Sequence, residues 1–98
     1  MTSEAHICAQ IADYLRARFG RRAYWFRPHG HLGQRAGVPD FVGWIDGRGF
    51  GIEVKGPKGK LSMRQCVELL AIVEAGGIAI VAKDVEHVMR CFEERRLA

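Results

Sequence analysis

The chain has 98 residues, of which 48% are hydrophobic and 27% charged, and its formal net charge is +4. This length fits one compact domain over residues 1–98, with a modest core. No apolar run approaches the roughly 20 residues of a membrane-spanning helix, so a membrane protein is excluded, and no signal peptide is expected. The mild basic excess favours polyanionic partners without proving them.

The cysteines do not suggest a disulfide framework. Cys8, Cys66 and Cys91 are an odd number, widely spaced, and include no CxxC pair. This pattern favours a reducing compartment, so we expect a cytoplasmic protein. Each cysteine falls on an apolar stripe of a predicted helix, which indicates a packing role.

Residues 3–19 are predicted to form an amphipathic helix. Thr2 or Ser3 can cap its start, and Gly20 ends it. Glu4 extends the apolar stripe of this helix with an acid. It either complements the helix dipole from the first turn or contributes to a buried site, and the sequence leaves both roles open. The stripe has helical spacing and comprises Cys8, Ile11, Ala12, Leu15 and Phe19.

An aromatic-rich strand is predicted at residues 23–27, and a polar, glycine-rich loop follows at residues 29–37. Aromatic side chains beside arginines can stack bases and hold phosphates, although most of them are expected to pack under helices. His29 and His31 invite a zinc interpretation, but no second ligand pair stands at metal spacing. We instead expect the loop to contact nucleic acid.

The central hairpin organises the chain. Two short apolar strands are joined at Asp46-Gly47, which is a strong turn signal. We expect a turn of four residues in which Ile45 lies opposite Phe50. That register places Asp40 opposite Lys55.

Side-chain alternation sorts the hairpin into two faces. Asp40, Glu53 and Lys55 share one face. An exposed Asp–Lys ion pair, worth only about 0–1 kcal/mol, is one interpretation of these charges. However, two carboxylates held close together repel unless a cation or proton lies between them, and a hard divalent cation is the natural occupant. The other face is apolar and is expected to be the core face, with Phe41, Ile45, Phe50, Ile52 and Val54.

A basic loop at residues 56–60 precedes a helix predicted from Ser62 to Ala75. Ser-x-x-Gln is a capping-box pattern, which accounts for Gln65. Alternatively, Gln65 lies in the first turn and reaches towards Lys55, and the two roles are hard to combine. The helix is apolar on most sides, so we expect it to be well buried.

The apolar run at residues 78–82 is predicted to be an interior strand. Since strand–helix–strand crossovers are right-handed, this strand should run parallel to the strand of Glu53. Asp84 caps a last helix, whose stripe includes Val88 and Phe92. The predicted order is therefore α-β-β-β-α-β-α, an α/β fold with a mixed central sheet.

Pro39-Asp40, followed after twelve residues by Glu53-Val54-Lys55, resembles the PD-(D/E)xK signature of the restriction-endonuclease-like nucleases. The longer string, continued by Lys60-Leu61-Ser62 and Gln65, is similar to the VRR-NUC branch of that superfamily. The resemblance covers about residues 4–88. It implies an αβββαβ core with a C-terminal helix, and a site for Mg²⁺ or Mn²⁺.

The resemblance also implies roles for individual residues. Asp40, Glu53 and the Val54 carbonyl would hold the metal, and Glu4 matches the position of a further acid. Lys55 would orient the attacking water or stabilise the transition state; we favour these roles over that of a general base, because its acidic neighbours favour its charged form. Gln65 completes the predicted catalytic set. The side chains expected to contact DNA are Lys58, Lys60, Arg64, Arg35 and His29.

The predicted function is a metal-dependent endonuclease that hydrolyses DNA, selective for branched or junction DNA in replication or repair. The alternatives are a non-catalytic nucleic-acid-binding module and a structural subunit whose acids form surface ion pairs. A symmetric homodimer is expected, because one small domain offers only the low end of the about 1,000–2,500 Å² of a specific protein–DNA interface. The expected contact surfaces are the strand Tyr24-Trp25-Phe26 and the end of the last helix, from Phe92 to Leu97.

Overall fold

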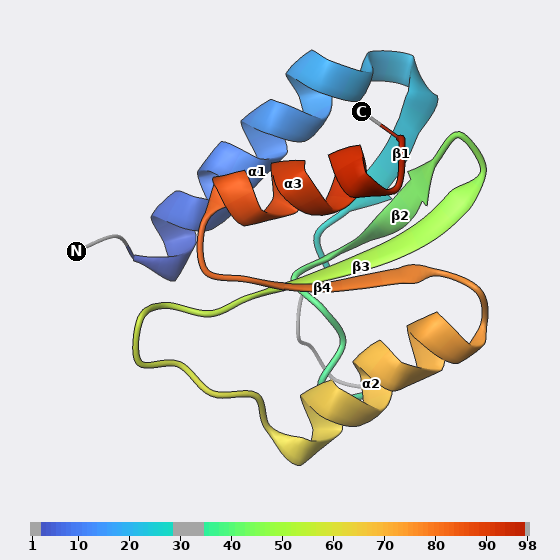
Figure 1. Ribbon diagram of the computed structural model, residues 1–98. Coiled ribbons are helices and arrows are strands. Elements are labelled where there is room, and N and C mark those ends of the chain that lie inside the picture. The colour runs from blue at the N-terminus through green and yellow to red at the C-terminus, as the bar shows by residue number, and fades with distance from the viewer. Residues whose placement is uncertain (1–2, 29–34, 98) are drawn as a thin grey trace.

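The computed structural model describes residues 3–28 and 35–97 and contains a mixed sheet between two layers of helices (Figure 1). The predicted order α-β-β-β-α-β-α is confirmed. The elements are α1 (Glu4–Phe19), a 3-10 turn (Gly20–Arg22), β1 (Ala23–Phe26), β2 (Phe41–Ile45), β3 (Arg48–Val54), α2 (Met63–Glu74), β4 (Ile78–Ala82) and α3 (Val85–Glu94).

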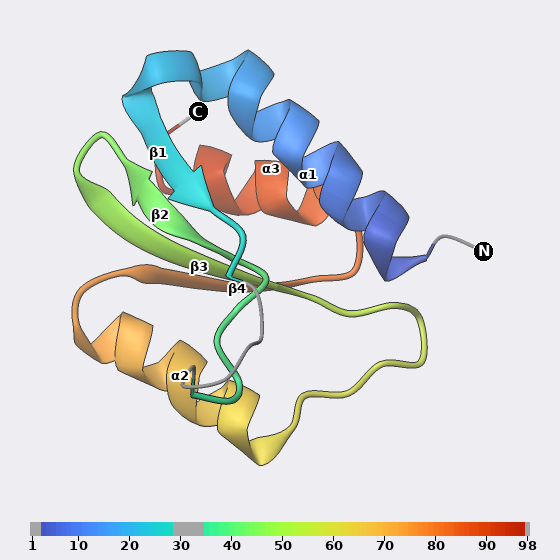
Figure 2. The same ribbon diagram turned by 180° about the vertical axis from the view of Figure 1, so that it is seen from behind.

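The strands lie in the order β1-β2-β3-β4. The first three are antiparallel, whereas β3 and β4 are parallel, as the predicted crossover requires. Helices α1 and α3 cover one face of the sheet and α2 covers the other, which both ribbon views show (Figures 1 and 2). The sheet therefore has one face packed under two helices and one face shared by a single helix and solvent.

The β2–β3 turn is shorter than predicted. Ile45 pairs with Arg48, so the turn contains only Asp46 and Gly47. Both have positive φ angles, 50° and 84°, as a tight type I′ hairpin turn requires. The side chain of Arg22 donates hydrogen bonds to both carboxylate oxygens of Asp46, at 3.0 and 3.2 Å from its Nε. The predicted pairing of Ile45 with Phe50 is therefore wrong by two residues, a shift that leaves every side chain on its predicted face.

The core lies between the sheet and the α1–α3 layer. The predicted stripe of α1 is buried there, together with Ile7, except that Ala12 is only half-buried. Phe92 of α3 is fully buried and contacts Phe19 and Phe50 edge to face, at 5.7 Å between ring centroids. Phe92 therefore cannot belong to a dimer surface as predicted, whereas residues 93–96 after it are exposed.

Helix α2 is far more exposed than predicted. Leu69 is the one buried residue of this helix. Because no second helix packs beside α2 on its face of the sheet, its outer side faces solvent. Cys66 is also exposed, contrary to its predicted packing role, whereas Cys8 is buried and Cys91 half-buried. The exposed apolar side chains, at 52–79% exposure, are Met63, Val67, Leu70 and Val73.

None of the helices in the described part of the chain has both the length and the apolar character needed to cross a membrane.

Candidate active site

Asp40 and Glu53 meet on the α2 face of the sheet, where β2 begins and β3 ends. Asp40 directly precedes β2, and its Oδ2 accepts a hydrogen bond of 2.7 Å from the backbone N–H of Val54. This bond links the two strands beyond their last ladder pair, Phe41 with Ile52. It fixes the Asp40 carboxylate beside the end of β3, so the predicted meeting of the two acids is observed.

Glu53 is the one buried charged residue of the described chain, at 4% exposure. Lys55 Nζ lies 3.7 Å from its Oε2, and Gln65 Nε2 donates a 3.1 Å hydrogen bond to the same oxygen. Burial, and then the negative charge of Asp40, raise the pKa of Glu53 to about 7 from an ordinary 4.5, although Lys55 opposes the shift. Near neutral pH the carboxyl is therefore poised between its two protonation states, and a nearby cation would favour the charged one.

Gln65 combines two functions that were predicted to be hard to combine, because it caps α2 and also reaches into the site. Its backbone N–H donates to Ser62 Oγ, and its side-chain oxygen accepts from the backbone N–H of Ser62 at 2.9 Å, which completes the capping box. Its side-chain nitrogen remains free for Glu53. The cap thus locks the amide in the orientation that serves the acid, and Gln65 reaches Glu53 rather than Lys55.

Glu4 lies beside this site without joining the acid pair. Its Oε2 accepts a 3.1 Å hydrogen bond from the backbone N–H of Gly56, directly after Lys55. Within residues 3–28 and 35–97, no group of three or more His, Cys, Asp and Glu side chains is arranged to hold a metal. The hydrogen bond to Gly56 connects the start of α1 to the end of β3. Glu4 therefore does more than interact with the dipole of its own helix.

The loop before Asp40 packs against the start of α2. A Cβ on Gly37, whose φ is 87°, would lie 2.6 Å from the backbone carbonyl of Arg64, so only glycine fits this approach. Arg35 from the same loop donates to the Glu68 carboxylate at 2.9 Å. This packing holds the segment that carries Asp40 against the helix that carries Gln65.

The predicted DNA contacts differ in their surroundings. Arg35 is engaged with Glu68 but remains 75% exposed along its side chain. Lys58, Lys60 and Arg64 are exposed and form no ion pair with any described residue. His29, and the zinc interpretation of His29 with His31, lie outside the described residues.

Arg27 was not predicted and lies next to Asp40. Its Nε donates to the backbone oxygen of Asp40 at 3.1 Å, and its guanidinium carbon lies 4.7 Å from the centre of the Phe41 ring. A terminal nitrogen is 4.0 Å from Asp40 Oδ1. Because β1 pairs with β2, a correct register of those two strands would have indicated this position.

Comparisons with known proteins agree with the geometry. Residues 7–86 match the VRR-NUC domain. A solved structure titled "VRR_NUC domain protein" has a TM-score of 0.74 at 18% identity, covering 99% of this chain and 91% of the other. A second, titled "VRR_NUC domain", has a TM-score of 0.64 at 22% identity, covering 87% and 92%. No curated protein matches the chain.

The fold and the matched residues define a nuclease-family domain. Within that class, the chain belongs to the VRR-NUC family.

Proposed function

We propose that this protein is a Mg²⁺- or Mn²⁺-dependent endonuclease that hydrolyses DNA phosphodiester bonds. The observation that carries the proposal is the pairing of Asp40 with the buried Glu53, whose pKa is raised to about 7. Two adjacent carboxylates are costly unless a cation lies between them. Nucleases of this family typically depend on a metal, which further supports the proposal.

The oxygen donors on this chain fit a hard divalent cation. Asp40 and Glu53 would hold it, together with the backbone carbonyl of Val54, and water would complete the shell because Mg²⁺ retains several waters. When bound, the cation supplies a Lewis acid that polarises the phosphate and lowers the pKa of a bound water. Gln65 would keep the Glu53 carboxylate oriented for this role through its 3.1 Å hydrogen bond.

Lys55 would stabilise the negative charge that develops on the phosphate. Its side chain is only 14% exposed and points its ammonium group at Glu53, so it is already held beside the acids. A fixed cationic donor in a sheltered site costs little reorganisation during the reaction. Glu4 would act beside the site, through Gly56, rather than as a third carboxylate of the pair.

The exposed Lys58, Lys60 and Arg64, with Arg35 and the undescribed His29, would bind phosphates that flank the scissile bond. The preferred substrate would be branched or junction DNA, as in replication or repair. A homodimer would enlarge the contact with such DNA.

The test is a cleavage assay on linear, flapped, forked and four-way DNA, in Mg²⁺, Mn²⁺ or EDTA. The proposal predicts cleavage with either metal and none in EDTA, and loss of cleavage in Asp40→Asn. Binding of DNA without cleavage in any metal would instead support the non-catalytic module. If the protein neither binds nor cleaves DNA, the result would support a structural subunit.

A further inference from the structure

An exposed aromatic surface lies on the same face of the sheet as the candidate active site. Helix α2 lies against β3 and β4 rather than against β1 and β2 (Figure 2). Three aromatic side chains stand on β1 and β2: Tyr24 is 68% exposed, and Phe26 and Trp44 are each 48% exposed. Tyr24 pairs with Trp44 across β1 and β2, and their ring centroids are 6.2 Å apart. We call Tyr24, Phe26 and Trp44 the aromatic platform.

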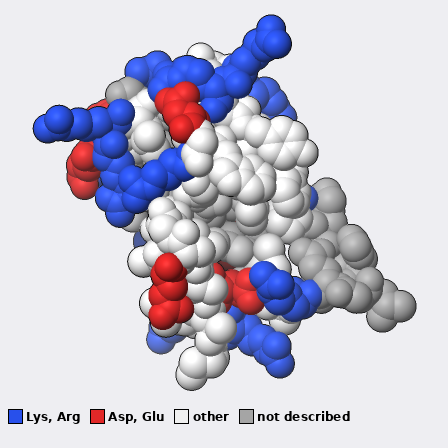
Figure 3. Space-filling view, turned by 90° about the vertical axis from the view of Figure 1, so that its right-hand side faces the viewer, with Lys and Arg blue, Asp and Glu red and all other residues white. Residues whose placement is uncertain are grey.

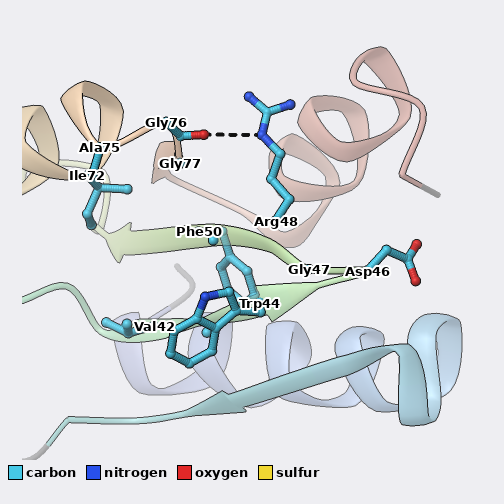
Figure 4. Close-up of a pocket in the computed structure, with 12 residues that line it drawn as sticks. Val42, Trp44, Asp46, Gly47, Arg48, Phe50, Ile72, Ala75, Gly76 and Gly77 are labelled. Atoms are coloured by element: carbon cyan, nitrogen blue, oxygen red, sulfur yellow. Dashed lines mark hydrogen bonds between the residues drawn. The ribbon is translucent and has the colours of Figure 1, made fainter.

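A groove runs beside the platform, between Trp44 and the end of α2. Its volume is about 560 Å³, and Ile72 and the Gly76–Gly77 turn form the opposite wall (Figure 4). Gly49 also lines it, and a Cβ there would lie 3.8 Å from Trp44 Nε1, so a larger residue would take up part of the space. The groove can therefore admit a flat, apolar group against the indole.

The platform is continuous with the acids. Asp40 directly precedes β2, and Val42 and Trp44 lie within it. Because side chains alternate along a strand, these three point to the same face of the sheet, and Val42 lines the groove. Trp44 is four residues from Asp40, or about 13 Å along an extended strand. A nucleic-acid strand bound at Asp40 and Glu53 can thus reach the platform along the same face of the sheet.

The charges around the platform suit a polyanion. Arg48 lies at the groove rim, where its Nε donates to the Gly76 oxygen at 3.3 Å and its guanidinium points away from the groove (Figure 4). Arg27, beside Asp40, is also exposed, but its guanidinium lies over the Phe41 ring and therefore on the α1–α3 side of the sheet, away from the platform. Asp46, the one acid lining the groove, is already bonded to Arg22. Figure 3 shows this side of the molecule as a largely uncharged area with charged side chains above and below it.

We propose that the aromatic platform binds an unpaired strand of the nucleic-acid substrate, with bases stacked on Trp44 and Tyr24 and a phosphate held by Arg48 at the groove rim. Aromatic faces bind bases without regard to sequence, and each stacked base is worth about 1–3 kcal/mol by alanine substitution. The substrate class is therefore DNA with a single-stranded segment next to the cleaved bond, such as a flap or fork. This deepens the proposed function and rests on it for the position of the strand.

Binding in EDTA tests this proposal without requiring cleavage. The Kd of a fluorescein-labelled single-stranded oligonucleotide is measured by anisotropy for the wild-type chain, Trp44→Ala and Tyr24→Ala, with a blunt duplex in parallel. We expect each variant to weaken single-strand binding about 5- to 150-fold, the equivalent of one lost base stack, with the duplex Kd changed less than about twofold. Trp44→Phe should retain most of the affinity because it keeps an aromatic face.

Leu70→Ala is the matched control, since Leu70 is similarly exposed at 57% but lies on α2. It should leave the single-strand Kd unchanged. The proposal is overturned if Trp44→Ala binds single strands like the wild type, or if Leu70→Ala loses as much affinity. Conversion of a dimer to a monomer by Trp44→Ala, seen in sedimentation, would assign the platform to a second copy and also overturn it. Single-strand binding through Trp44 without any metal-dependent cleavage would overturn the proposed function alone.

Discussion

The two faces of the sheet do different work, although the same strands build both. On the α1–α3 face, Ile52 of β3 is completely buried among apolar side chains. The next residue, Glu53, points to the α2 face, where it is buried beside Lys55 and Gln65. Strand alternation thus lets one short segment stabilise the fold with every second residue and build the site with the others. Adjacent positions should therefore respond to substitution in opposite ways.

The largest expected effect tests the stabilising face. Ile52→Ala should lower the free energy of unfolding by about 2–5 kcal/mol, because it removes buried methyl groups and leaves a cavity. Ile52→Val should cost only about 0.5–1.5 kcal/mol. Urea unfolding followed by circular dichroism measures both. If Ile52→Ala lowers the free energy of unfolding by less than about 1 kcal/mol, the α1–α3 face does not have the stabilising role assigned to it.

Lys55 provides the complementary test on the other face. Lys55→Ala should lower kcat by about 10²–10³, as expected for the loss of one preorganised charge-stabilising donor. Lys55→Arg should restore only part of the rate, because a planar guanidinium does not replace a compact ammonium. Single-turnover cleavage at saturating metal separates this role from metal binding. Unchanged turnover with weakened metal affinity would contradict it.

The raised pKa of Glu53 makes stability in EDTA depend on pH. The folded state binds the proton more tightly than the unfolded state, because the pKa is about 7 rather than 4.5. This contribution is fully present below pH 4.5 and is lost as the pH rises through 7. Relative to Glu53→Gln, the wild-type chain should lose about 3 kcal/mol over that interval, from 1.36 kcal/mol per unit of pKa. If the free energy of unfolding changes with pH in the same way for the wild type and Glu53→Gln, this prediction is refuted.

Gln65 should give the smallest of these effects on activity. Gln65→Ala removes both the capping oxygen and the donor to Glu53, and residues that orient a metal-binding carboxylate by a hydrogen bond typically contribute about 10- to 100-fold. Gln65→Glu is the informative comparison, because it can keep the capping box but places a third carboxylate against Glu53. If Gln65→Glu cleaves as well as the wild type, the amide has no role at the acid.

The sequence predicts the sides of the hairpin better than its register. Alternation alone places Asp40 and Glu53 together, and this holds whichever even shift the turn adopts. The turn length follows from Asp46 and Gly47 both taking a left-handed conformation, with φ of 50° and 84°; an Asp-Gly pair favours such a two-residue turn, so the sequence carried this signal and the four-residue turn overlooked it. Arg27 was missed for a related reason, since its contact with Asp40 depends on how β1 pairs with β2.

The exposure of α2 could not be predicted from its own residues. Its apolar content implies a buried helix, but burial depends on how many elements cover each face of the sheet. Here one face has two helices and the other has one, so Val67 and Leu70 are left outside. The dual role of Gln65 also needed coordinates, because it depends on the two ends of one amide pointing in different directions.

Under the proposed function, Asp40 and Glu53 together hold a divalent cation. Calorimetric titration of Mn²⁺ into the wild-type chain, Asp40→Asn and Glu53→Gln, at pH 7.5 and without DNA, tests it most directly. Circular dichroism should first establish that all three are folded. We expect saturable binding to the wild type that is lost or weakened at least about tenfold in each variant, because each variant loses a charged oxygen ligand. Equal Mn²⁺ affinity in all three proteins would contradict it.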